Sequence, residues 1–344
     1  MEEARSAGET RGRRYLLTAH RSEPPQLDFP PVRNGIDYLS SVVEYLDENV
    51  SPVGPRNLKY AVLHLQAAAE VLLKARLLRE HWSLVFKDLG KATREKFEKG
   101  DFESCTTGDA VKRLRNIAGV TIHPKESDAL DALAKDRNAL QHFGLTHNAG
   151  AVEARAGEVL DFLMRFLEDE LLPLLDGPEH KSALLAMVPV MEGVRNISSY
   201  VDLRLDRLRG ELKGRESRTI RCPNCEQMTL VAAPGGGACH FCGESWPSDE
   251  LLASDYLGGP AQLEALARAC PQCDAHTLVQ GVVFANSPRG NDLWFCFCCA
   301  ARYTPEELVS CAGCSRPWPM EADIDGSDAT LCPDCRDQTE PEGA

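Results

Sequence analysis

The sequence predicts an all-α helical bundle followed by a small array of zinc-stabilised ribbons made of short β-hairpins and knuckles. Apolar residues recur every three to four positions through the first half of the chain, which is typical of amphipathic helices. Thirteen of the fourteen cysteines lie between Cys222 and Cys335. We therefore expect a flexible leader over 1–30, a helical bundle over 31–178, a helical connector over 179–218 and three tandem four-cysteine ribbons over 219–344.

The first residues predict the cellular compartment. No stretch of 18 apolar residues occurs in the 344-residue chain, and the leader is polar, rich in proline and arginine, and without an apolar core. We therefore expect a cytoplasmic protein with no membrane span or secretory signal. In such a reducing compartment, cysteine pairs indicate metal ligands rather than disulfides.

The apolar spacing predicts five helices in the bundle, over Ile36–Val50, Leu58–Leu77, Val111–Ile117, Leu130–Leu140 and Val152–Leu175. We expect Thr106, Thr107 or Asp109 to cap the third helix and Ser127 to cap the fourth. A further helix is expected from about Pro189, with a coiled-coil-like seam at Val194, Ile197, Val201, Leu205, Leu208 and Leu212. This seam either packs on its own bundle or joins two chains.

Six CxxC pairs predict the metal sites of the second half. Taken consecutively, they form three four-cysteine sites with 13, 22 and 17 residues between the two turns of each site. A structural Zn²⁺ takes four tetrahedral ligands, and each turn supplies two thiolates. We therefore predict about three structural zinc ions bound by Cys222, Cys225, Cys239, Cys242, Cys270, Cys273, Cys296, Cys299, Cys311, Cys314, Cys332 and Cys335.

Two alternatives remain open within this array. Neighbouring turns can also pair in a cross-braced arrangement, and Cys298 can replace Cys299 as a ligand. Cys105 is expected to be buried. A complete shell of four thiolates leaves no position for a substrate, so catalytic zinc is not expected.

Charge separates the two halves. The chain has 38 basic and 52 acidic side chains and a formal net charge of −14. The segment from Ile220 onward holds six arginines, no lysine and eighteen acidic residues. Zinc tetrathiolate centres add further negative charge, which opposes phosphate binding. We expect this tail to bind a protein partner or to act as a scaffold, with Trp246, Trp294 and Trp318 as ribbon core or, alternatively, as binding anchors.

The segment Arg137-Asn138-Ala139-Leu140-Gln141-His142 carries the candidate catalytic residues of the bundle. Its Arg-x4-His pattern lies near the end of the fourth predicted helix, and it resembles the motif of the HEPN family of small helical domains. The resemblance covers about residues 34–176. It implies a metal-independent endoribonuclease that acts as a homodimer, with Arg137, Asn138 and His142 in the catalytic site. A second Arg-x4-His match joins Arg76 and His81.

Such residues suit RNA cleavage, since imidazole transfers protons near neutral pH and a guanidinium binds phosphate oxygens. Glu70 and Lys74, one helical turn apart, either line the same cleft or form a surface ion pair. Arg137 and His142 can also be simply a charged helix end. Three functions follow: a HEPN-type ribonuclease with a partner-recruiting zinc tail, in a bacterial toxin or antiphage role; a non-catalytic HEPN-like binding domain with a zinc-ribbon adaptor; or a structural scaffold.

Overall fold

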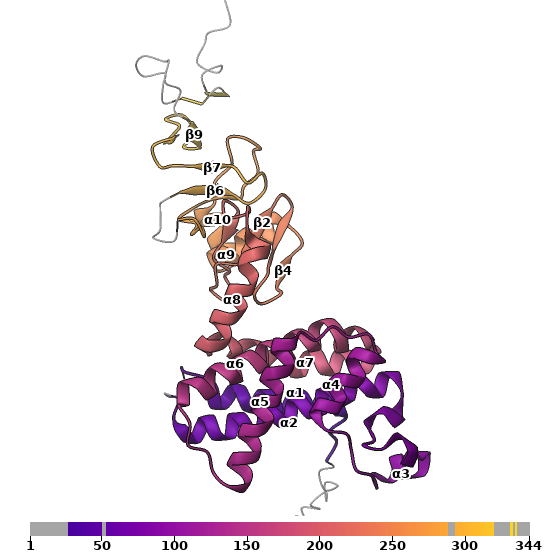
Figure 1. The fold of residues 1–344 in the computed structure, drawn as a ribbon. Coiled ribbons are helices and arrows are strands. Elements are labelled where there is room, and N and C mark those ends of the chain that lie inside the picture. The colour runs from indigo at the N-terminus through magenta and orange to yellow at the C-terminus, as the bar shows by residue number, and fades with distance from the viewer. Residues whose placement is uncertain (1–26, 50–52, 288–292, 320–330, 333, 336–344) are drawn as a thin grey trace, which may run out of the picture.

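The computed structural model describes residues 27–49, 53–287, 293–319, 331–332 and 334–335. The predicted leader lies outside the described residues except for 27–30. The described chain consists of a helical bundle and a module of small sheets, which helix α8 connects (Figure 1). Within these ranges, no helix has the length and apolar character needed to cross a membrane. The helical first half and the small-strand second half confirm the fold class in its coarse form.

The first half is built from α-helices and short 3₁₀ or π-helical segments. In chain order they are α1 (Pro31–Leu46), α2 (Pro55–Glu80), η1 (Trp82–Val85), η2 (Leu89–Lys91), α3 (Arg94–Lys99), α4 (Thr107–Asn116), α5 (Pro124–His142), α6 (Ala149–Phe166), η3 (Leu167–Leu171), η4 (Leu172–Leu174), α7 (Gly177–Gly193), η5 (Val194–Asn196) and α8 (Ser198–Leu212).

Helix α2 is the central helix of the bundle, in contact with α1, α4, α5 and α6. Most of its apolar side chains are buried along its length, and Leu65 and Leu72 are fully buried. The approach of α1 is close because Gly35 faces Leu72. A Cβ atom at Gly35 would lie 2.4 Å from Leu72 Cδ2, so a larger residue there would push the two helices apart.

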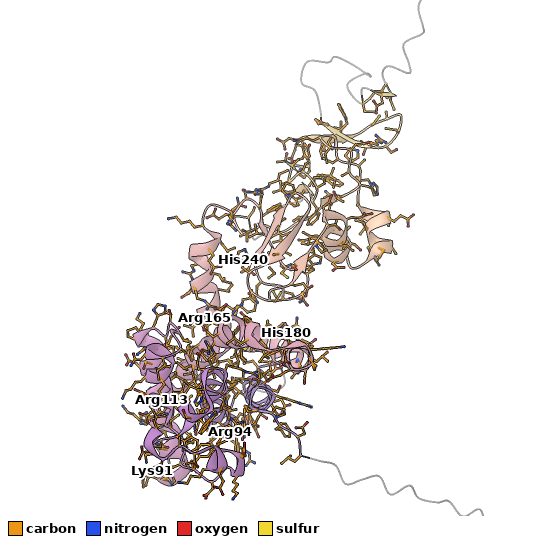
Figure 2. All side chains as sticks on the ribbon, turned by 90° about the vertical axis from the view of Figure 1, so that its right-hand side faces the viewer. Lys91, Arg94, Arg113, Arg165, His180 and His240 are labelled. Atoms are coloured by element: carbon orange, nitrogen blue, oxygen red, sulfur yellow. The ribbon has the colours of Figure 1, made fainter. Side chains whose placement is uncertain are left out.

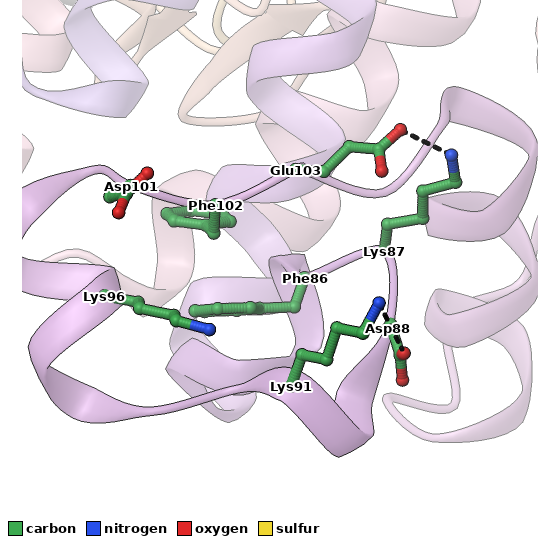
Figure 3. A pocket seen from close by; sticks show the side chains of 8 residues that line it. All are labelled: Phe86, Lys87, Asp88, Lys91, Lys96, Asp101, Phe102 and Glu103. Atoms are coloured by element: carbon green, nitrogen blue, oxygen red, sulfur yellow. Dashed lines mark hydrogen bonds and ion pairs between the residues drawn. The ribbon is translucent and has the colours of Figure 1, made fainter.

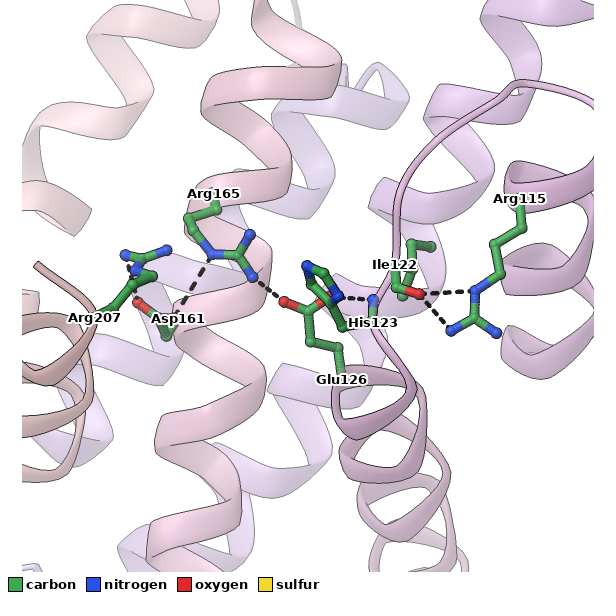
Figure 4. Close-up of polar contacts among 7 residues, drawn as sticks. All are labelled: Arg115, Ile122, His123, Glu126, Asp161, Arg165 and Arg207. Atoms are coloured by element: carbon green, nitrogen blue, oxygen red, sulfur yellow. Dashed lines mark hydrogen bonds and ion pairs between the residues drawn. The ribbon is translucent and has the colours of Figure 1, made fainter. Parts of the chain in front are cut away.

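Helix α5 carries the Arg-x4-His segment, and its first turn is fixed by polar contacts. Glu126 accepts a hydrogen bond from the backbone N–H of His123 at 2.8 Å, which satisfies one free donor at the helix start. The helix begins at Pro124, so the expected cap at Ser127 is wrong. Arg165 of α6 also pairs with Glu126, and Arg115 of α4 donates to the Ile122 carbonyl at 2.9 Å (Figure 4).

The single helical stretch expected from about Pro189 to Leu212 is wrong in its continuity. Residues 189–193 end α7, and α8 begins at Ser198, because the backbone turns at η5 and at the extended residue Ile197. Val194, Ile197 and Leu208 are buried within the chain's own core, so the seam packs on its own bundle. Arg207 of α8 pairs with Asp161 of α6 at 3.0 Å, which fastens α8 to the bundle (Figure 4). Helices α3 and α7 begin at positions where no helix start was expected.

The described part of the second half contains three small antiparallel sheets and two helices. The first sheet has the order β1-β2-β3-β4, the second β5-β6-β7, and the third pairs β8 with β9. Their bounds are β1 (Thr219–Ile220), β2 (Leu230–Ala233), β3 (Gly236–Cys239), β4 (Ser245–Trp246), β5 (Leu278–Gln280), β6 (Trp294–Cys296), β7 (Arg302–Tyr303), β8 (Leu308–Ser310) and β9 (Pro317–Pro319). Helices α9 (Asp249–Leu257) and α10 (Pro260–Leu266) follow β4 and were not expected.

The first sheet is joined to the bundle by a buried aromatic contact. The Phe241 ring lies 6.0 Å from the Tyr200 ring of α8, in an edge arrangement. Arg204 of α8 stacks over Phe241 with its guanidinium carbon 5.6 Å from the ring centre. Burial raises the pKa of Tyr200 to about 12, so this side chain stays neutral within the joint. Figure 2 places His240, which precedes Phe241, in the module beside α8.

Candidate functional site

Three groups of four cysteines lie in the second half, and each group joins two consecutive CxxC turns. The first group is Cys222, Cys225, Cys239 and Cys242, the second is Cys270, Cys273, Cys296 and Cys299, and the third is Cys311, Cys314, Cys332 and Cys335. In each group the sulfur atoms all lie within 4.8 Å of one another. The predicted ligand set is therefore brought together by consecutive turns, and the cross-braced alternative is wrong.

The sulfur separations match a tetrahedral zinc centre. A zinc–sulfur bond of about 2.3 Å in a regular tetrahedron sets the sulfurs about 3.8 Å apart. The Sγ atoms of Cys222 and Cys242 are 3.9 Å apart in the first group. The separation is 3.7 Å between Cys270 and Cys299, and 3.7 Å between Cys314 and Cys332. A disulfide requires about 2.05 Å, so these thiols are spaced for a shared ion.

The turns repeat one backbone pattern. In the first turn, the N–H of Glu226 donates to the Cys222 carbonyl at 2.9 Å, and the N–H of Cys222 donates to the Gln227 carbonyl at 2.9 Å. Glu226 has a φ of 63°, in the left-handed region. Residues at the same place in other turns share this conformation, namely Asp274, Ala300 and Ser315, together with Gly243. This reversal aims both sulfurs of a turn at one point.

Two buried threonines next to the centres were not predicted. Thr229 Oγ1 lies 3.3 Å from Cys239 Sγ, and Thr277 Oγ1 lies 3.7 Å from Cys296 Sγ. Each threonine follows the second cysteine of its first turn by four residues, and each contacts the first cysteine of the next turn. Such contacts orient a ligand and tune its charge. The repeated spacing Cys-x3-Thr in the sequence is the signal that identifies them.

Each group contains a thiol prepared to lose its proton. The backbone N–H of Cys332 donates to Cys311 Sγ at 3.2 Å, and this contact lowers the pKa of Cys311 to about 6. Hydrogen bonds from neighbouring thiols lower the pKa of Cys239 and of Cys296. Since zinc binds thiolates, these groups fit three structural zinc ions. All four ligands of each site come from the chain, which leaves no position for a substrate.

The remaining cysteines and Trp246 take the structural positions that were expected. Cys299, not Cys298, belongs to the second group. Cys105 is buried in the bundle. Trp246 is buried in the first ribbon and donates to Asp255 Oδ2 at 2.8 Å, whereas Trp294 and Trp318 are half-buried.

The bundle holds a second candidate site, a cluster of polar side chains on α2. Gln66, Glu70 and Lys74 follow one another at successive turns of this helix. Gln66 Nε2 donates to Thr107 Oγ1 at 2.9 Å, and its Oε1 atom is buried without a hydrogen-bond partner among the described residues. Lys74 Nζ binds Glu70 Oε1 at 2.5 Å and Ser104 Oγ at 2.7 Å. We call Gln66, Glu70, Lys74, Ser104, Thr107 and Arg137 the polar cluster.

Arg137 comes from α5 and completes this polar cluster. Its Nη2 atom lies 4.0 Å from Glu70 Oε2, and its Nη1 atom donates to Gln141 Oε1 at 3.2 Å. Glu70 therefore stands between two cations from helices that are far apart in sequence. Of the two alternatives for Glu70 and Lys74, the structure has the ion pair, and Arg137 lies beside the same carboxylate. A shared substrate cleft stays a prediction.

Asn138 and His142 lie further along α5 and are exposed. The His142 ring lies 5.9 Å from the ring of Phe143, which is 90% exposed. His142 is the last residue of the helix, five positions after Arg137. Five residues turn an α-helix by about 140° beyond a full turn, so Arg137 and His142 project from different sides of α5 within one chain. The structure thus brings Arg137 to Glu70 and Lys74, but not His142.

The second Arg-x4-His match has a structural role. Arg76 is buried, donates to Glu80 Oε1 at 2.6 Å and lies 3.9 Å from Glu170 Oε2. His81 accepts a hydrogen bond from the backbone N–H of Ser83 at 3.3 Å and caps η1. Arg76 is thus held by carboxylates within the bundle, and the exposed His81 is held by Ser83 at the start of η1.

A small cavity of about 110 Å³ lies near α3 (Figure 3). Its floor is the stacked pair of Phe86 and Phe102, whose ring centres are 4.1 Å apart. Lys87 pairs with Glu103, and Lys91 lies 3.7 Å from Asp88. Because its charges are balanced and its volume is well below that of ordinary ligand pockets, this cavity is not a candidate site.

Comparison of the chain with protein-family models, with curated proteins and with solved structures found no match. The candidate sites are therefore assigned from their own geometry and chemistry.

Proposed function

We propose that the chain is a metal-independent endoribonuclease of HEPN type that acts as a homodimer and carries a zinc-ribbon module for partner recruitment. The observation that carries this proposal is the convergence of Glu70, Lys74 and Arg137 from two helices in one polar cluster. The same helix, α5, ends in an exposed histidine at the position that the HEPN motif requires.

The reaction consists of one transesterification. The 2′-oxygen of a ribose forms a bond to the adjacent phosphorus, and the bond from phosphorus to the 5′-oxygen breaks. A base takes the proton of the 2′-hydroxyl, and an acid gives a proton to the leaving 5′-oxygen. The products are a 2′,3′-cyclic phosphate and a 5′-hydroxyl. In the proposed site, His142 transfers protons, and Arg137 neutralises the phosphate oxygens with its fork of donors.

A second copy of the chain completes the site. One imidazole does not act efficiently as base and acid in the same step, and Arg137 and His142 project from different sides of α5. Two copies related by a two-fold axis would bring two histidines and two arginines around one phosphate. Asn138 lies one helical turn before His142, where its amide can bind a phosphate or sugar oxygen.

Cleavage of a labelled single-stranded RNA in EDTA tests this proposal. We expect wild-type protein to cut the RNA and His142→Ala to reduce the rate by at least about 100-fold, because general acid–base catalysis contributes that much. His147→Ala is the matched control, since His147 is also exposed and lies five residues further on. Unchanged cleavage by His142→Ala, or equal losses in both variants, would contradict the assignment.

The functional context follows from the family resemblance. We propose a role as a bacterial toxin or in antiphage defence, where RNA cleavage stops growth of the host cell. Expression of the wild-type chain in bacteria is then expected to arrest growth, and expression of His142→Ala is not. Growth arrest by both forms would contradict this role.

The zinc module supports a second candidate function, a non-catalytic HEPN-like domain with a protein-binding adaptor. Its three cysteine groups are complete, and its acidic composition opposes RNA binding. In this alternative the polar cluster binds RNA or a protein and cuts neither. The EDTA assay distinguishes the two, because an adaptor leaves the RNA intact.

A further inference from the structure

Helix α7 exposes an apolar face to solvent. Leu184 is 48% exposed, Leu185 is 64% exposed and Val188 is 50% exposed. These residues lie within one turn of each other on the same side of the helix. Single exposed apolar residues are common on protein surfaces, but contiguous ones indicate an interaction site. None of these residues belongs to the polar cluster or to the cysteine groups.

This face is one wall of a groove whose other wall is the first zinc ribbon. The groove has a volume of about 360 Å³. From α7, the side chains of Leu184, Met187, Val188 and Met191 line it. The opposite wall contains Cys225 and Cys242, two ligands of the first zinc centre. The volume is sufficient for large apolar side chains, and methionines adapt to the shape of what they contact.

The two walls are fixed relative to each other. Arg195, directly after α7, donates from Nη1 to the Asn224 carbonyl at 2.6 Å. Asn224 lies inside the first CxxC turn, and its Nδ2 atom contacts Cys242 Sγ at 3.8 Å. The end of α7 is therefore tied to the zinc ligands themselves. Zinc binding would thus hold the groove in shape.

Charge around the groove defines the occupant. Glu192 and Glu244 lie at its edge, and neither has an ion-pair partner within the described part of the chain. Arg195 is the one basic residue among the lining residues that the structure describes, so two carboxylates face one cation in the groove. A filled zinc tetrathiolate adds two negative charges. RNA, an anionic membrane and a second acidic copy of the module are all repelled. A basic amphipathic helix is complementary in both its apolar face and its charge.

We infer that the groove between α7 and the first zinc ribbon binds a basic amphipathic helix of a partner protein, with the apolar side of that helix on Leu184 and Val188. This is the helix-in-groove mode of peptide recognition. The inference rests on the recruiting role proposed above for the zinc module. It does not depend on RNA cleavage.

Fluorescence anisotropy with a synthetic peptide tests the inference. The probe is a labelled helical peptide of about 18 residues, or five turns, composed of leucine on one face and lysine on the other. A peptide with glutamate in place of lysine is the charge control. We expect the lysine peptide to bind the full chain and the glutamate peptide not to bind.

The decisive variant is Leu184→Ser combined with Val188→Ser. We expect it to bind the lysine peptide at least about tenfold more weakly, because buried apolar side chains dominate helix–groove affinity. The combined change Leu251→Ser and Leu266→Ser is the matched control, since both leucines are 52% exposed on α9 and α10. This control removes equal apolar character without touching the groove, and we expect it to bind like the wild type. A zinc content of three per chain in both variants checks that each is folded.

Three results would overturn the inference. The first is equal affinity of the wild type and the groove variant. The second is equal binding of the lysine and glutamate peptides. The third is a wild-type dimer in sedimentation that the groove variant alone converts to a monomer, because a second copy would then cover this face. RNA cleavage is measured separately on the wild type, so a wild type that binds the lysine peptide but leaves the RNA intact would contradict the ribonuclease and not the groove.

Discussion

Replacing Cys225 with serine removes one of the four ligands of the first zinc centre. In the structure, Cys225 Sγ lies 3.6 Å from Cys239 Sγ, close to the sulfur separation of about 3.8 Å in a zinc tetrathiolate. A serine hydroxyl does not ionise near neutral pH and is a poor substitute for a thiolate. We therefore expect Cys225→Ser to bind two zinc ions per chain where the wild type binds three.

The loss of this ion is expected to unfold the first ribbon. Structural zinc contributes about 10–16 kcal/mol to the folding of small domains at pH 7. That amount equals or exceeds the total stability of an ordinary domain, about 5–15 kcal/mol. Cys222, Cys225 and Cys239 are each less than 5% exposed, so water cannot replace the ion around their sulfurs. Without zinc, ionised thiolates in this position would be buried charges without a partner.

Native mass spectrometry counts the zinc ions, and hydrogen exchange over residues 219–246 reports folding of the first ribbon. Cys298→Ser is the matched control, because Cys298 precedes a ligand but belongs to no cysteine group. It is expected to bind three ions and to keep the wild-type exchange pattern. Three ions in Cys225→Ser, two in Cys298→Ser, or a protected first ribbon without zinc would refute the reasoning.

Further predictions concern the contact between the first ribbon and α8, the packing of α7 on α1, and Glu70 of the polar cluster. Phe241→Ala removes the aromatic contact between the first ribbon and α8. It is expected to lower the free energy of unfolding by about 3–5 kcal/mol, as measured by urea titration with zinc present. An unchanged midpoint would show that this contact does not stabilise the chain. Gly193→Ala would place a Cβ atom 2.0 Å from Val43 Cγ1 and is expected to lower the free energy of unfolding by about 1–3 kcal/mol. Gly54→Ala meets no atom within 4 Å and is not expected to destabilise the chain. Equal melting temperatures of the two variants would refute the close packing at Gly193. Glu70→Gln is expected to slow RNA cleavage by about 10- to 100-fold at unchanged melting temperature, since the carboxylate orients two cations; wild-type cleavage by this variant would remove Glu70 from the site.

The long periodic helices could be predicted from the sequence because one apolar stripe specifies both helix type and buried face. The stripe from Leu58 to Leu77 lies within α2, and the stripe from Val152 onward begins α6. The start of α5 was misplaced because Pro124 and Glu126 form a stronger start signal than Ser127. Helix α7 was missed because it is apolar on several sides and contains Pro189, which hides its period.

The zinc ligands could be predicted completely because chelation fixes both residue type and local spacing. The polar cluster of the bundle could be predicted only in part, since contacts between helices depend on packing and not on sequence distance. Glu70 and Lys74 were candidates from their spacing, but the hydrogen bond of Lys74 to Ser104 spans 30 residues. Gln66 and Thr107 were missed because nothing in their sequence surroundings distinguishes them from ordinary polar residues.

The ends of the RNA fragments test the central claim most directly. Wild-type protein and a labelled RNA are incubated in EDTA, and the products are identified by mass spectrometry. Attack by the 2′-hydroxyl, with His142 as the proton-transfer group, predicts fragments with a 2′,3′-cyclic phosphate and a 5′-hydroxyl. Fragments with a 5′-phosphate and a 3′-hydroxyl, or an RNA that stays intact until a divalent metal is added, would contradict the proposed function.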